Sequence, residues 1–130
     1  MRKNLGMELR NIFSSFAATD LDVARTFYQD TLGLPVETNE MGILQISFEG
    51  NNLIVYPKAD HQPANFTVLN LEVADIDAAV DELVAKGVTF ERYDGIEMDD
   101  KNISRGNGPT IAWFTDPSGN IMSVIESPGK

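Results

Sequence analysis

A plan of apolar strand, acidic helix start and glycine-terminated helix occurs twice in this chain. The first copy spans residues 11–35 and the second spans residues 66–88. Their helix starts, D-L-D at 20–22 and D-I-D at 75–77, lie 55 positions apart, and the strands before them align at the same offset. A repeat of this size indicates two copies of one supersecondary unit.

Each copy carries signals for the start and the end of a helix. Thr19 is expected to cap the first helix, with Asp22 three positions later as in an acidic capping box. Asp75 is expected to cap the second helix, and Gly33 and Gly87 suit the left-handed position that ends a helix. Acidic side chains in a first turn favour the helix dipole, so we interpret these aspartates as structural. The buried stripes are predicted at Val23, Ala24, Phe27, Tyr28 and Leu32, and at Ile76, Ala79, Val80 and Leu83.

Three further strands are predicted after each helix, so each half reads β-α-β-β-β. They are expected at 36–40, 43–49 and 53–57, and at 88–93, 110–115 and 121–126. The turn D-P-S-G at 116–119 joins the last two, with proline fixing φ and glycine allowing positive φ. We therefore predict a single α+β domain over residues 1–130, with modules at approximately 8–58 and 65–127 and a polar linker between them.

The composition limits the classes of function. The chain has 10 basic and 20 acidic residues, a formal net charge of −10, which disfavours nucleic acid and anionic membranes but is compatible with a cationic ligand. No cysteine is present, which excludes disulfides and a cysteine nucleophile. The N-terminal residues contain no apolar signal segment and no run reaches membrane-spanning length, so we expect a cytoplasmic protein.

Three segments resemble the vicinal oxygen chelate superfamily, which includes glyoxalase I, extradiol dioxygenases and bleomycin-resistance proteins. They are A-T-D-L-D-V-A-R-T-F-Y-Q-D-T-L-G-L at 18–34, V-A-D-I-D-A-A-V-D-E-L-V-A-K-G-V-T-F at 73–90 and A-W-F-T-D-P-S-G-N at 112–120. The resemblance covers residues 11–126 and implies that the modules curl into a U-shaped mixed sheet with a concave pocket. It also implies a homodimer, since modules of this superfamily commonly pair across subunits or dimerise.

In the metal-dependent members, four side chains on the concave face hold a divalent cation. The resemblance carries these positions onto Phe13, Val55, Val68 and Ser123. None of the four offers the imidazole or carboxylate donors that such a cation needs. Their neighbours on the same strand faces offer none either: Asn11, Ser15, Leu53, Pro57, Phe66, Asn70, Ile121 and Ile125. We therefore expect no metal and no cofactor, and we expect the only histidine, His61, to be an exposed linker residue.

The same face predicts a mostly apolar pocket for a small molecule. The candidate ligand-binding residues are Phe13, Ser15, Val55, Val68, Asn70, Trp113 and Ser123. We expect Asn70 and Ser123 to orient the ligand, Trp113 either stacks on it or packs in the core, and no residue is assigned a catalytic role. The preferred interpretation is a metal-independent small-molecule-binding protein similar to the bleomycin-resistance branch.

Two other functions stay open from the sequence. One is a lyase or dioxygenase with a displaced metal site, using His61 or the acidic residues Glu97, Asp99 and Asp100. The other is an interaction module whose pocket is vestigial. The insertion at 94–108 could act as a lid over the pocket or stay a solvated acidic loop.

Overall fold

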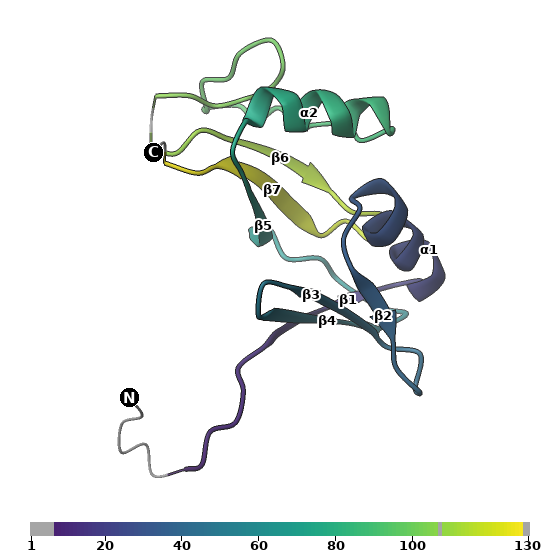
Figure 1. Ribbon diagram of the computed structural model, residues 1–130. Helices are drawn as coiled ribbons and strands as arrows, with labels where there is room; N and C mark the ends of the chain where they lie inside the picture. The colour runs from purple at the N-terminus through teal and green to yellow at the C-terminus, as the bar shows by residue number, and fades with distance from the viewer. Residues whose placement is uncertain (1–6, 107, 129–130) are drawn as a thin grey trace.

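The computed structural model describes residues 7–106 and 108–128 and contains two sheets with helices packed against them (Figure 1). The four-stranded sheet has the order β1-β4-β3-β2, and the three-stranded sheet has the order β5-β7-β6. The elements are β1 (Ser14–Ala18), α1 (Leu21–Thr26), the π-helical turn η1 (Phe27–Thr31), β2 (Val36–Thr38), β3 (Leu44–Phe48), β4 (Asn51–Pro57), β5 (Thr67–Val73), α2 (Ile76–Ala85), β6 (Ile111–Thr115) and β7 (Ile121–Glu126). The predicted α+β class is confirmed.

The sequence predicts neither a signal segment nor a membrane-spanning segment, and the structure bears on these two expectations differently. Residues 1–6, which carry most of the argument against a signal segment, lie outside the described residues. None of the helices in the described part of the chain is long and apolar enough to cross a membrane.

Both helices begin at an aspartate. α1 is capped by Asp20, whose carboxylate accepts two backbone N–H groups of the first turn. The predicted cap, Thr19, instead donates its backbone N–H to the Ser118 hydroxyl in the β6–β7 turn. α2 is capped by Asp75 as predicted. Both caps thus use the carboxylate directly before the helix, the strongest class of N-cap side chain.

Residues 88–93 do not form the predicted strand. The Glu91 N–H donates to the Trp113 carbonyl at 2.8 Å, so the segment does lie beside β6. The adjacent Phe90 carbonyl accepts the side-chain amide of Asn102 in the loop that follows. A single backbone hydrogen bond to β6 does not make a ladder, so the described second module has three strands where the first has four.

The two sheets repeat one pairing scheme. In each, the first strand of the module runs parallel to the last and lies at an edge that no other described strand covers: β1 beside β4, and β5 beside β7. Ser15 lies opposite Ile54, and Asn70 lies opposite Ser123. The first strands therefore keep the predicted 55-residue offset, with Ser15 equivalent to Asn70. Ile54, rather than Val55, is the counterpart of Ser123.

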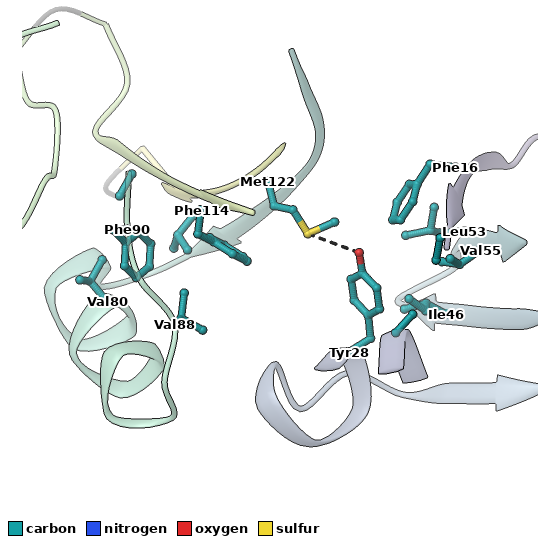
Figure 2. Packing of buried hydrophobic residues seen from close by; sticks show 14 of the residues in the cluster. Phe16, Tyr28, Ile46, Leu53, Val55, Val80, Val88, Phe90, Phe114 and Met122 are labelled. Atoms are coloured by element: carbon teal, nitrogen blue, oxygen red, sulfur yellow. Dashed lines mark hydrogen bonds between the residues drawn. The ribbon is translucent and has the colours of Figure 1, made fainter. Parts of the chain in front are cut away.

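One hydrophobic core joins the two modules. In Figure 1, α1 lies between the two sheets, and its continuation η1 carries Tyr28, which is completely buried. The Tyr28 ring is 6.1 Å from the Phe16 ring and its hydroxyl is 3.6 Å from the Met122 sulfur (Figure 2). Phe27 reaches the Phe114 ring at 6.3 Å. Because these contacts cross from one sheet to the other, the modules fold as one unit.

Candidate functional site

Three predicted site residues form a row across the second sheet. Asn70 on β5, Ser123 on β7 and Trp113 on β6 are neighbours in register, so their side chains share one face. The Ser123 hydroxyl, which is completely buried, donates to the Asn70 amide oxygen at 2.5 Å. The Trp113 indole N–H donates to the Thr67 hydroxyl at 3.1 Å, and its ring makes an edge contact with Tyr93 at 5.5 Å. Trp113 is therefore half-buried, with its indole N–H and one ring edge used by contacts within the protein.

Two predicted positions fall elsewhere because the strand registers differ from expectation. Val55 pairs with Phe16 and is completely buried on the face that packs against Tyr28, so its assignment to the same face as Ser123 was wrong. Val68 lies in a β-bulge, where the β5–β7 register shifts between Thr67 and Leu69. A bulge adds one unpaired residue and breaks the alternation of faces on which the prediction relied.

The residues at the register-equivalent positions do not fit a divalent metal. Ser15 with Ile54, and Asn70 with Ser123, offer two hydroxyls, an alkyl chain and one amide. A zinc or iron site needs imidazole, carboxylate or thiolate donors, which none of the four provides. Within residues 7–106 and 108–128, no group of three or more His, Cys, Asp or Glu side chains is placed to hold a metal ion.

A cavity of about 910 Å³ lies between the two modules, along the open edge of β5. Its walls are mostly apolar and include Phe13, Phe48, Leu53, Val68, Leu71 and Leu83. Three of the seven predicted ligand-binding residues line this cavity, namely Phe13, Val68 and Asn70. Ser15, Val55, Trp113 and Ser123 do not. The site is thus shifted from the row across the sheet to the edge of β5, with Asn70 common to both.

A family model matches most of the chain and shows which family it belongs to. The model of the Glyoxalase/Bleomycin resistance protein/Dioxygenase superfamily matches residues 11–124. The chain belongs to this superfamily. No curated protein matches the chain significantly.

Solved structures show the same superfamily fold at low sequence identity. A superfamily member from Sphaerobacter thermophilus is 24% identical, with a TM-score of 0.67 over 92% of this chain and 98% of its own. TnmS3, an antibiotic binding protein from Streptomyces sp. CB03234, is 22% identical, with a TM-score of 0.68 over 94% of this chain and 99% of its own. A hypothetical protein of S. aureus, SA1046, is 14% identical, with a TM-score of 0.69 over 93% of this chain and 96% of its own. These likenesses establish the fold.

The insertion of this superfamily member at 94–108 is fastened to the second module. Asp99 accepts the backbone N–H groups of Lys101 and Ile103 and the Arg105 guanidinium, and Arg105 also bonds Asp77 on α2. Burial alone would raise the pKa of Asp99, but the Ile103 N–H and Arg105 together lower it below its usual value. Asp99 is therefore used inside the loop, and no described residue of the insertion lines the cavity.

Sequence reasoning missed a buried polar network that joins the modules. His61 Nε2 lies 2.8 Å from the Asn120 amide oxygen, so this histidine is not simply an exposed linker residue. The Asn120 amide nitrogen donates to the Ala17 carbonyl and to Asp116, which also accepts the Tyr28 hydroxyl. The motif D-P-S-G-N at 116–120 contained the signal, since its polar ends had to find partners if the turn was buried.

Proposed function

We propose that this chain is a metal-independent small-molecule-binding protein of the bleomycin-resistance type, which binds its ligand in the cavity beside β5. The observation that carries the proposal is the combination of a drug-sized apolar cavity with metal-site positions that hold no suitable donor. Apolar walls with a few polar groups are the usual composition of a small-molecule site. TnmS3, which shares this fold, is an antibiotic binding protein, and this agrees with the proposed class of function.

Asn70 is the polar group best placed to orient such a ligand. It lines the cavity, and the buried Ser123 hydroxyl fixes its amide oxygen from the opposite side. The amide nitrogen then faces away from Ser123, toward an acceptor on a ligand. In this proposal Asn70 contacts the ligand and Ser123 holds the Asn70 side chain in place. Both residues of the predicted ligand-orienting pair therefore keep a role, but only Asn70 touches the ligand.

We also propose that the protein forms a homodimer and acts in the cytoplasm. Support for the dimer comes from the β1 and β5 edges, which no other described strand covers. Apolar side chains lie exposed near these edges, including Ile12 at 78% and Phe48 at 62% exposure. Exposed apolar side chains beside unpaired strand edges favour association. Static light scattering that gives the mass of one chain at micromolar concentration would contradict the dimer.

The binding function is tested with a neutral apolar fluorophore, N-phenyl-1-naphthylamine, in a fluorescence titration. Val68→Arg places a long charged side chain in the cavity and is expected to weaken binding at least about tenfold. Val84→Arg is the matched control, because Val84 is 53% exposed on α2 and lies outside the cavity. Circular dichroism and the unfolding midpoint of each variant verify that both are folded.

Two results would contradict the proposed function. Equal affinity of wild type and both arginine variants, or no saturable binding by the wild type, would remove the cavity as a binding site. Stoichiometric, chelator-resistant metal found by elemental analysis of the purified protein would instead support the lyase or dioxygenase alternative.

A further inference from the structure

The charged groups of the cavity all have one sign. Three carboxylates line it, from Glu49 in the β3–β4 turn, Glu72 on β5 and Glu82 on α2. Among the described residues, no lysine, arginine or histidine lines it. All three residues are exposed, and the walls between them are apolar, so their field reaches the cavity through water and depends on salt.

The nearest structural explanation for the carboxylates is pairing with basic side chains, and it accounts for only one of them. Lys86, the residue that caps the C-terminus of α2, lies 3.8 Å from Glu82. Glu49 and Glu72 take part in none of the ion pairs between described residues. Glu49 also occupies a positive φ of 50°, in the two-residue turn with Gly50 that brings its side chain to the cavity wall.

We infer that the cavity selects amphipathic cations: ligands with an apolar body and an ammonium or similar positive group. This inference rests on the proposed function and narrows its ligand class. The apolar body is buried against the walls formed by residues such as Phe13 and Leu71, and the positive group lies between Glu49 and Glu72. The two carboxylates come from different modules, Glu49 from the first and Glu72 from the second.

Three probes that share a fluorophore and a chain of nearly equal length separate charge from apolar burial. They are dansylcadaverine, which ends in an ammonium, dansyl pentylamide, which ends in a methyl group, and dansyl-6-aminohexanoate, which ends in a carboxylate. The expected order of affinity at low salt is cation, neutral, anion. Raising the salt concentration is expected to reduce the difference between cation and neutral probe, because screening acts on the charges alone.

Single charge removals then identify the groups responsible. Glu72→Gln and Glu49→Gln are each expected to lower the affinity for dansylcadaverine about threefold to fivefold. Neither substitution is expected to change the affinity for dansyl pentylamide. Glu40→Gln removes the same charge from an exposed residue outside the cavity and is expected to change neither probe. This control separates the local carboxylates from the net charge of the whole protein.

The outcomes distinguish this inference from the proposed function. Equal affinity for the cationic and neutral probes, tighter binding of the anion, or equal losses from Glu40→Gln and Glu72→Gln would overturn the cation selectivity while the cavity stays a binding site. Failure of all three probes, together with failure of N-phenyl-1-naphthylamine, would overturn both.

Discussion

The Tyr28 hydroxyl offers the sharpest test of how the two modules are held together. It is buried, donates to Asp116 and contacts the Met122 sulfur at 3.6 Å. Tyr28→Phe removes this hydroxyl and keeps the ring that packs against Phe16 and Phe27. A hydrogen bond to a charged acceptor contributes about 1.5–3 kcal/mol. Asp116 retains the Asn120 amide and two backbone N–H groups, so we expect a loss of about 2 kcal/mol.

This loss converts into a measurable shift of the melting temperature. An unfolding entropy of about 2.1 cal/mol/K per residue gives about 0.27 kcal/mol per degree for 130 residues. The expected decrease in Tm is therefore about 7 °C, measured by calorimetry and checked by urea unfolding with an unchanged m-value.

Tyr56→Phe is the matched control for the same chemical change. Tyr56 lies on β4 and is 38% exposed, so its hydroxyl is expected to contribute less than about 0.5 kcal/mol. A Tyr28→Phe loss no larger than that of Tyr56→Phe would refute the argument that the buried network joins the modules.

Two further predictions concern the same region. Burial and the charge of Asp116 raise the pKa of Tyr28 above its ordinary value of 10.0, so above pH 10 the unfolded state loses this proton first. Stability from this group is thus complete below pH 10 and falls by about 1.4 kcal/mol per pH unit above it, so the loss of stability that urea unfolding measures at pH 9–11 should be steeper in wild type than in Tyr28→Phe. In Gly119→Ala, the new Cβ would lie 3.0 Å from Pro63 Cγ at a φ of +87°, whereas Gly42→Ala meets no atom within 4 Å at a φ of +82°. Both variants are expected to lose about 1–2 kcal/mol of stability, because alanine is strained at a positive φ. Gly119→Ala is expected to lose more stability than Gly42→Ala because of the contact with Pro63, and equal unfolding midpoints would contradict that contact.

The helices and most strands of each module were predictable because local signals and the repeat agree. Asp75 and the strand 121–126 are found as expected. Thr19 was wrong as a cap because sequence alone does not show that its backbone N–H bonds Ser118, 99 positions away. The strand at 88–93 was wrong because the segment lies beside β6 with a single backbone hydrogen bond, from the Glu91 N–H to the Trp113 carbonyl, which local sequence signals do not show.

The candidate site was predicted less well, and one residue of register explains much of the difference. The predicted site treats Val55 as the counterpart of Ser123, whereas the observed pairings make Ile54 its counterpart and so align Asn51 with Asn120. A slip of one residue moves every side chain of a strand to the opposite face, which is why Val55 was assigned to the pocket. The better signal was the glycine: Gly50 and Gly119 both have positive φ, and each directly precedes the aligned asparagine.

The segments that identify the superfamily are the segments whose polar groups are used by the fold. Asp116 and Asn120 of the last motif bond Tyr28 of the first motif, the β1 backbone and His61 of the linker. Their hydrogen-bonding capacity is spent in joining the modules, and in the described residues no buried side-chain nitrogen or oxygen is left without a partner. Such groups cannot change without a loss of stability, whatever the protein binds. Three polar residues that line the cavity, Asn70, Glu49 and Glu72, lie outside these motifs and are free of that constraint. Membership in the superfamily therefore constrains how the modules join, and the chemistry of the ligand has to be inferred from the cavity itself.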